Sequence, residues 1–360
     1  MSANQLFTPL SAPHAATSNS VSRVMITVMV ALVPATLFGF WLYGWPAIYL
    51  FLITVAAAVA GEAFSLRLAD RQATPVLFDG SAILTGWLLA LSLPPWAPWW
   101  IGVFGGFFAT VLGKQVFGGL GQNLFNPAMV ARVALLISFP VQMTAWVAPV
   151  PLNSAMAPGL IDGLMVTLKG MPQGLDAIAS ASLLGFSKTE LSRGVDLLQS
   201  AAHAPLQTWF GSRSGSLGET AGWLIAAGGI VMLFMRIITW HIPVAMLAGI
   251  AIPAAILHSV DPARYIDAGT HLLSGGAILG AFFIATDYVT SPSSPRGQLI
   301  FGAGCGVLTY VIRTWAGYPE GVAFAVLLMN SLTPVIDSYV QPRIYGRNNK
   351  GAALDPQTQR

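Results

Sequence analysis

The stretch LDAIASASLLGF, residues 175–186, holds side chains that could do chemistry: one acid, Asp176, and two hydroxyls, Ser180 and Ser182. A serine hydroxyl can be esterified to a phosphate where it is exposed and where small neighbours, such as Ser180 and Ala181, let a modifying enzyme approach. Asp176, six residues before Ser182, could help to seat that enzyme's metal ion. The residue types alone favour a loop or a helix start capped by serine.

A second candidate stretch, SGSLGETAGW, begins at residue 214. Ser216 and Glu219 have the spacing of a capping box, in which the two residues satisfy each other's backbone N–H groups at a helix start. The free backbone N–H groups of Gly215, Gly218, Glu219 and Thr220 would also suit a phosphate or a ring carbonyl.

Three acids lie in or beside apolar segments, Glu62, Asp287 and Asp337. A charge in lipid is costly, so such acids usually face a protein interior or a water path. They are candidates for an ion or proton path. Alternatively, Asp287 and Asp337 are acids at helix ends, at the level of the lipid headgroups. The alternative for Glu62 is an ion pair with Arg67.

Phosphate-loop and metal chemistry have little support in the sequence. The glycine-rich stretch FGGLGQNLFNP (117–127) is not a phosphate-binding loop, because Lys114 precedes its glycines. It suits a close-packed turn or a ligand contact equally well. One cysteine, Cys305, forms no internal disulfide. We expect no metal site, since no two histidines share a ligand spacing: His14, His203, His241, His258 and His271.

Composition indicates a membrane protein that crosses the bilayer several times. Of its 360 residues, 55% are hydrophobic and 9% are charged, and the mean hydropathy is +0.68, whereas a soluble domain carries about 25% charged residues. Residues 1–20 are polar and do not predict a cleavable signal peptide. No basic patch is interleaved with aromatic residues, so we expect membrane lipid as a partner and no nucleic acid.

Ten segments are predicted to span the bilayer, because each approaches the roughly 20 mostly apolar residues that a spanning helix needs. They are 22–43, 46–66, 80–95, 97–114, 125–146, 221–238, 242–259, 273–289, 298–315 and 321–340.

Loop charges predict the orientation, because Lys and Arg favour the cytoplasmic side. With both termini cytoplasmic, the outer loops hold only Arg264 and Arg313. The cytoplasmic side then holds Arg23, Arg67, Arg71, Lys114, Arg236, Arg296, Arg343, Arg347, Lys350 and Arg360.

The predicted domains are a first membrane half (1–146), an outer loop (147–220), a second membrane half (221–346) and a polar cytoplasmic tail (347–360). GSAIL in the first half matches GGAIL in the second. With five spans in each half, two such repeats would be inverted, and inverted repeats with interrupted helices often place a binding site near the midplane.

Long ordered stretches resemble the D subunit of the Rnf (or Rsx) electron transport complex and, more distantly, the B subunit of the sodium-translocating NADH:quinone reductase. The matching stretches cover most of both membrane halves. They are LTGWLLALSLPPWAPWW, KQVFGGLGQNLFNPAMV, LLISFPVQMTAW, LLSGGAILGAFFIATDYVT, PRGQLIFGAGCGVLTYVIRTWAGYPEGVAFAVLLMNSLTPVID and PRIYG.

The resemblance implies an all-α, urea-transporter-like fold of ten transmembrane helices in two inverted five-helix repeats. It implies one subunit of a six-subunit ion-translocating oxidoreductase in the bacterial inner membrane, a translocase that moves sodium ions or protons. The chain would not be catalytic alone.

The resemblance also implies a covalent FMN, attached through its phosphate by a flavin transferase outside the cytoplasm. The family's motif is Asp, two residues, Ser or Thr, a small residue, Ala and an acceptor that is usually Thr. Here Ala179 replaces Ser or Thr, and Ser182 replaces the acceptor Thr. Serine keeps the nucleophilic oxygen, so we expect FMN on Ser182, with Ser180 as the alternative. Residues 215–220 are expected to line the flavin pocket.

Three points stay open at this stage. A second, noncovalent flavin is a further candidate by analogy with the related reductase. The implied fold is shared with urea channels, so a channel or transporter for small solutes is an alternative function. The departures at Ala179 and Ser182 leave a flavin-free structural anchor of the complex as another.

Overall fold

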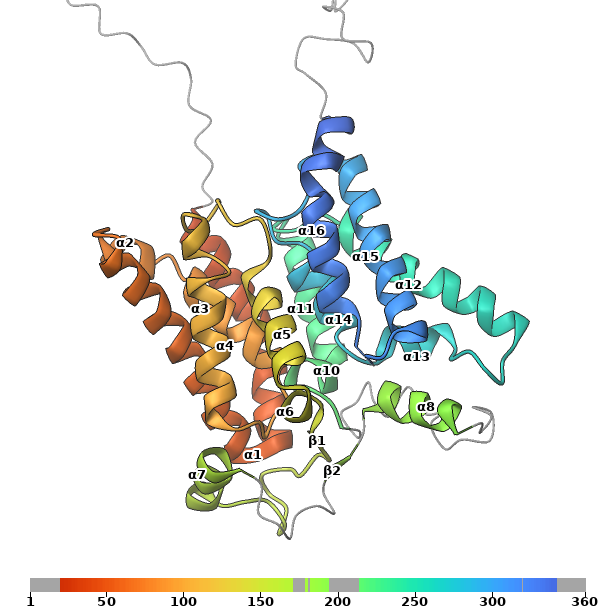
Figure 1. Ribbon diagram of the computed structural model, residues 1–360, viewed down its shortest axis with the longest axis horizontal. Helices are drawn as coiled ribbons and strands as arrows, with labels where there is room; N and C mark the ends of the chain where they lie inside the picture. Colours follow the sequence, from red (N-terminus) through yellow and green to blue (C-terminus); the bar gives the residue numbers. More distant parts are fainter. Residues whose placement is uncertain (1–19, 171–178, 181, 194–213, 319, 342–360) are drawn as a thin grey trace, which may run out of the picture.

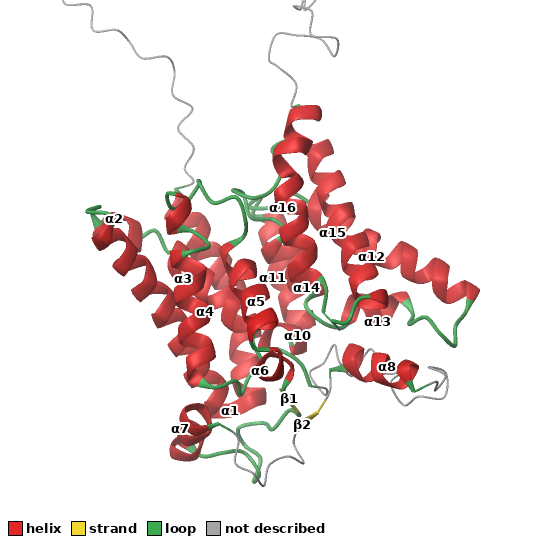
Figure 2. Cartoon of the chain, viewed as in Figure 1, coloured by secondary structure: helices red, strands yellow, loops and turns green. Residues whose placement is uncertain are grey.

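A computed structural model shows that the described part of the protein consists mainly of helices joined by loops (Figure 2). The structure describes residues 20–170, 179–180, 182–193, 214–318 and 320–341. The expected site residues Asp176 and Ala181 lie outside these ranges. Within them, the only strands are β1 (Trp146–Val147) and β2 (Ala179–Ser180), which pair antiparallel. The predicted all-α class is confirmed.

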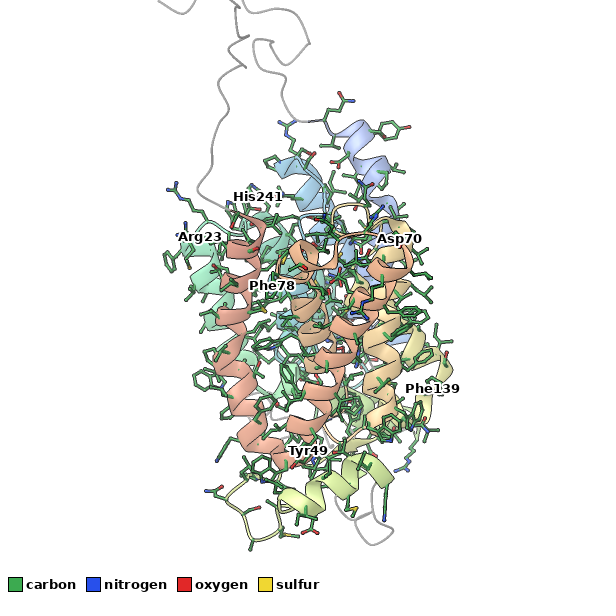
Figure 3. The ribbon with its side chains drawn as sticks, turned by 90° about the vertical axis from the view of Figure 1, so that its left-hand side faces the viewer. Arg23, Tyr49, Asp70, Phe78, Phe139 and His241 are labelled. Carbon is green, nitrogen blue, oxygen red and sulfur yellow. The ribbon has the colours of Figure 1, made fainter. Side chains whose placement is uncertain are left out.

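The first two predicted spans are the two legs of α1 (Val21–Leu68). The helix is interrupted at Gly44 (φ 72°, ψ −159°), a left-handed conformation that glycine adopts without strain. Pro46 follows the break and has no N–H to continue the first leg. Figure 3 shows the result: Arg23 and Asp70 lie at one end of the molecule and Tyr49 at the other.

The rest of the first half packs against α1, mainly through α3 and α4. Small residues permit this close contact: a Cβ on Gly106 of α4 would lie 2.5 Å from the carbonyl oxygen of Thr54 in α1. The elements are α2 (Ala73–Leu77), α3 (Ser81–Ser92), α4 (Trp99–Val111), η1 (Gln115–Phe117), α5 (Pro127–Ser138) and α6 (Pro140–Thr144).

The predicted outer loop contains β1, α7 (Leu160–Lys169), β2, α8 (Leu183–Ser192) and α10 (Leu217–Thr220). Helix α7 packs against α1. Helix α10, by contrast, is buried among the membrane helices, and Leu217 belongs to the main apolar core.

The second half begins at α11 and lies to the right of the first half in Figure 1. Helices α12 and α15 pack closely, and a Cβ on Gly249 of α12 would lie 2.7 Å from the carbonyl oxygen of Ala303 in α15. The elements are α11 (Gly222–Phe234), α12 (His241–Val260), α13 (Ala268–Leu273), α14 (Ala277–Leu279), the π-helix η3 (Gly280–Ile284), α15 (Pro295–Trp315) and α16 (Val322–Tyr339).

Exposed apolar side chains cover the outer helices, as expected of a protein surrounded by lipid. Leu37, Leu52, Phe234, Ile252 and Leu328 are each more than half exposed. Within the described residues, four helices are long and apolar enough to cross a membrane: Val21–Leu68, Trp99–Phe117, His241–Val260 and Val322–Tyr339. The protein is therefore a membrane protein.

Several predicted spans are shorter or broken in the structure. The prediction of one helix over 125–146 was wrong, because α5 ends before Pro140 and the chain continues as the short helix α6 and strand β1. The prediction over 273–289 was also wrong: glycines 275 and 276 separate α13 from α14, and η3 follows at once. The broken helices leave backbone groups free in the interior, where they meet polar side chains.

The two ends of the molecule differ in what they carry. In Figure 1, α1 begins and α16 ends at the top of the view, whereas α7, β1 and β2 lie at the bottom. The structure therefore places the described parts of the predicted outer loop that precede α10 at one end of the molecule. The start of α1 and the end of α16 lie at the other end.

Candidate functional site

Ser182 is the N-cap residue of α8, and its hydroxyl accepts a hydrogen bond from the N–H of Gly185 at 3.2 Å. The side chain is buried, with 2% of its surface exposed. The cap that the residue types alone favoured is therefore present. The hydroxyl is not exposed as esterification requires, so the helix start must open before a phosphate can be attached.

The segment around Ser182 is fixed to both halves of the protein. On one side Ser180 in β2 pairs with Trp146 in β1, close to the end of α6. On the other side Lys188 of α8 donates hydrogen bonds to the carbonyl oxygens of Tyr318 at 2.8 Å and of Ala316, at the end of α15. Partial burial lowers the pKa of Lys188. Ser182 thus lies between the first and second halves.

The predicted capping box is confirmed at the start of α10. The Ser216 side chain accepts from the backbone of Glu219, and the Glu219 carboxylate accepts from the N–H of Ser216 at 3.2 Å. The hydroxyl of Thr220 donates back to the Ser216 carbonyl oxygen at 3.2 Å. Tyr43 holds Gly215 by donating to its carbonyl oxygen at 3.0 Å and accepting from its N–H at 3.2 Å.

Glu219 also reaches the second half, where it accepts the N–H of Gly275 at 2.7 Å. The neighbouring N–H of Gly276 donates to Glu320 at 3.3 Å. Gly218 lies in the same contact, since a Cβ there would meet Leu279 of α14 at 2.8 Å. The predicted residues Gly215, Gly218, Glu219 and Thr220 are thus brought together in the protein interior.

Two guanidinium groups accompany these two carboxylates. Arg313 lies 3.5 Å from Glu320 and donates to the carbonyl oxygens of His271 at 2.6 Å and Ser274 at 3.0 Å. Arg132 of α5 donates to the carbonyl oxygen of Ser92 at the end of α3. Both guanidinium groups are nearly buried, so each charge depends on these partners.

A cavity adjoins this charged cluster and encloses about 480 Å³ of space, its open mouth included. Its wall includes backbone and side chains from both halves. They are Ser92, Met129, Arg132, Leu136, Ser216, Glu219, Gly276, Leu279, Ile284, Glu320, Val322, Ala323 and Phe324. We name this the α10 cavity.

A second cavity, the α3 cavity, begins beside Ser81 at the other end of α3 and encloses about 750 Å³, its mouth included. Its wall is mostly apolar, but Lys114 and Asn123 contribute polar groups. Lys114 is 1% exposed and pairs with Glu62 at 2.5 Å. The Oδ1 atom of Asn123 is buried without a hydrogen-bond partner among the described residues.

The three predicted membrane acids have different positions. Glu62 is fully buried, and it pairs with Lys114 in place of the predicted partner Arg67. Asp287 lines the α3 cavity and accepts from Val289 and Thr290, in the turn after η3. Asp337 accepts from the backbone and hydroxyl of Ser293 at the surface.

Sequence reasoning missed the cations of both clusters. Lys114 was considered only in relation to a phosphate-binding loop and as a charge on the cytoplasmic side. Arg313 was placed in an outer loop, but it is 3% exposed in the last turn of α15. Arg132 was not considered, although an arginine inside the apolar run of a predicted span signals a buried partner.

Comparison with known proteins identifies the family of the chain. The chain matches the NQR2, RnfD, RnfE family over residues 9–346. It is 51% identical to the D subunit of the ion-translocating oxidoreductase complex of Halorhodospira halophila over 95% of this chain and 96% of that protein. It is 53% identical to the protein of the same name in Stutzerimonas stutzeri, over 93% and 95% of the two chains. The chain therefore belongs to the NQR2, RnfD, RnfE family.

Proposed function

We propose that this chain carries electrons through an FMN joined by a phosphoester to Ser182, as one subunit of an ion-translocating complex. Family membership supports this reading: the chain is the D subunit of an ion-translocating oxidoreductase complex. The covalent FMN, the other five subunits, the flavin transferase and the bacterial inner membrane are parts of the proposal.

The position of Ser182 fits a phosphoester. A phosphate on its oxygen would lie at the N-terminus of α8, where the helix dipole and free N–H groups favour negative charge. The cap that Ser182 makes to Gly185 would be replaced by bonds from the same N–H groups to the phosphate. Serine therefore keeps the role that threonine usually has in the family motif.

The α10 cavity is the proposed site of the flavin ring. Arg132 supplies a positive charge that favours the reduced, more negative ring, and Glu219 on the same wall is held by the N–H groups of Ser216 and Gly275. When bound, FMN accepts and donates one or two electrons, and the protein holds it at a fixed place and potential.

A second, noncovalent flavin is proposed for the α3 cavity. Its mostly apolar wall suits a planar ring, and the unpaired Asn123 Oδ1 offers an acceptor to a ring N–H. Lys114 offers a donor to a ring carbonyl. These groups are buried, so a ligand that pairs with them relieves a desolvation cost.

The proposed topology is ten spans in two inverted repeats, with the Ser182 segment outside the cytoplasm. The matched stretches support the repeats: Gly80 (φ 83°) precedes the start of α3, and Gly275 (φ 67°) precedes the start of α14. Glu62 and Asp287, which are close to the α3 cavity, and Asp337 at the surface stay candidates for an ion path.

The observation that carries the proposal is the place of Ser182 at the N-terminus of α8, where helix N–H groups favour a phosphate. The test is to express the chain with its flavin transferase, denature it and view the gel under ultraviolet light. Fluorescence in the wild type and in Ser182→Thr, with none in Ser182→Ala, is the expected result. Ser180→Ala is the matched control and should stay fluorescent.

Other outcomes assign the alternatives. Fluorescence that survives in Ser182→Ala and vanishes in Ser180→Ala moves the attachment site to Ser180. A dark wild type that still assembles with its partner subunits indicates a structural anchor. A dark wild type that conducts a small solute in liposomes indicates a channel.

A further inference from the structure

We infer that Asp79, Ser81 and Lys114 form a proton relay from the protein surface to the wall of the α3 cavity. The relay would deliver the proton that accompanies an electron reaching a redox cofactor in that cavity. The inference rests on the proposed function, because it needs such a cofactor there.

The hydrogen bonds of the relay are continuous and short. Lys114 Nζ donates to Ser81 Oγ at 2.5 Å, and Ser81 Oγ donates to Asp79 Oδ1 at 2.5 Å. The N–H of Ser81 also donates to Asp79 Oδ1 at 2.7 Å, which keeps the carboxylate in place. Three side chains from two separate segments of the chain are thus joined in one line.

The two ends of the line have the exposure that a relay requires. Asp79 is partly exposed in the turn between α2 and α3. The neighbouring Phe78 is 79% exposed and lies at the end of the molecule that also carries Arg23 (Figure 3). Lys114 at the other end is 1% exposed and lines the cavity. Protons can therefore enter from water at Asp79 and reach the buried amino group of Lys114.

Lys114 has one donor more than its partners in the described structure use. An ammonium group carries three N–H bonds, and two of them serve Ser81 and Glu62. The third is available to a group in the cavity, whose wall also carries the unpaired Oδ1 of Asn123.

Electrostatics gives the relay a driving force. The pair of Lys114 and Glu62 is neutral overall, so an electron that reaches the cavity adds an unbalanced negative charge to a buried site, which is costly. The other charged or titratable groups at this cavity are Asp79 behind Ser81 and Asp287 and Tyr288 on its wall. None of these described residues is a second cation, so the added charge is balanced only when a cation enters, and the relay supplies one as a proton.

The transfer balances in atoms and charge. The electron comes from the redox chain of the complex. One proton leaves the ammonium group of Lys114 and bonds to the reduced group in the cavity. The Ser81 hydroxyl then turns from Asp79 to the amine that remains and gives it its proton. The Asp79 carboxylate takes a proton from water at the surface and passes it to the Ser81 oxygen, so Asp79 ends as the carboxylate it was at the start. One electron and one proton have then entered the cavity.

The test uses the purified complex with its flavins, and compares the wild type with Ser81→Ala and Lys114→Arg. Ser81→Ala removes the middle of the relay. Lys114→Arg keeps a cation beside Glu62 but cannot release a proton. Flavin reduction is followed by its absorbance in H2O and D2O. Both variants should retain flavin and reduce it about 100-fold more slowly, within the range for loss of a proton-transfer group.

Chemical rescue separates proton transfer from a structural role. Imidazole or acetate, which can carry protons into the cavity, should restore much of the rate in Ser81→Ala. Ser65→Ala is the matched control, because the Ser65 hydroxyl lies on α1 near Glu62 and donates to the Gly61 carbonyl of its own helix. It should reduce flavin at the wild-type rate.

Two results would overturn the relay. One is a wild-type rate with an unchanged isotope effect in Ser81→Ala. The other is a wild-type complex whose only flavin is lost with Ser182→Ala, since the α3 cavity would then hold none. The second result leaves the covalent FMN proposal standing, and a complex with no flavin at all contradicts both.

Discussion

Each end of α3 borders a buried charge cluster, and the two clusters place different cations beside their buried carboxylates. Near Ser81 a single lysine pairs with a single carboxylate, Glu62. Near Ser92 two arginines accompany two carboxylates. Ser81 and Ser92 are about 16 Å apart along the helix, at about 1.5 Å per residue. Both clusters thus lie inside one protein core.

The choice of cation separates their roles. Lysine is a point charge that can lose its proton, whereas the guanidinium group of arginine stays charged and binds through a planar fork. Arg313 uses that fork on two carbonyl oxygens and Glu320, so it fixes the backbone between α13 and α14. The cluster of Lys114 near Ser81 therefore suits proton movement. The cluster of Arg132 and Arg313 near Ser92 suits a fixed electric field around an electron carrier.

The largest expected effect comes from breaking the ion pair of Lys114 and Glu62, which is more deeply buried than the pair of Arg313 and Glu320. Lys114→Met leaves the Glu62 carboxylate with no cation, and the two side chains are 1% and 0% exposed. We expect a loss of about 3–5 kcal/mol in the free energy of unfolding, as for other broken buried pairs. Thermal unfolding in detergent measures it. The double change Lys114→Met with Glu62→Leu should recover most of the loss, and equal instability of both variants would contradict the coupling.

At the cluster near Ser92, the stability of the protein should depend on the shape of the arginine side chain as well as on its charge. Arg313→Lys retains a cation for Glu320 but cannot reach the carbonyl oxygens of His271 and Ser274 together. An unsatisfied buried acceptor costs about 1–3 kcal/mol, so the melting temperature should fall, though less than for Lys114→Met. The exposed Arg264→Lys is the control, and an equal fall there would remove the claim of a fork-specific role.

The comparison also shows what sequence can and cannot predict. The break at Gly44 and the capping box of Ser216 and Glu219 are local, so spacing alone predicted them. The partner of Glu62 could not be predicted that way. Arg67 lies five residues on, at about 140° around the helix, and so faces elsewhere. Lys114 comes from another element and reaches Glu62 only when the helices pack.

The arginines show the same limit for topology. Counting charges placed Arg313 in a loop, because hydropathy does not tell an inward-facing arginine at a helix end from an exposed one. Its partners His271, Ser274 and Glu320 come from two other segments. The asymmetry of the remaining loop charges does not depend on it, so the predicted orientation is unchanged.

The electronic difference between the clusters can be tested at the flavin. Arg132→Gln keeps a donor for the Ser92 carbonyl and removes the positive charge beside the α10 cavity. The reduced ring should then be less favoured, and the potential of the FMN proposed on Ser182 should fall by about 30 mV, equal to about 1.4 kcal/mol for a two-electron couple. Redox titration measures it. The exposed Arg296→Gln should leave the potential unchanged, and no shift in Arg132→Gln would place the ring elsewhere.

The smallest expected effect concerns the hydrogen bonds that hold α8, the helix that Ser182 caps, against the end of α15, the helix that carries Arg313. Lys188→Met removes the hydrogen bonds from α8 to the carbonyl oxygens at the end of α15, where no further helix N–H is available to them. We expect local opening of α8 to become easier by about 1 kcal/mol, seen as faster hydrogen exchange over 183–192. The exposed Lys169→Met in α7 serves as the control. Faster exchange should also speed attachment of FMN, because Ser182 is buried until α8 opens; slower attachment would mean that the transferase recognises α8 in its closed state.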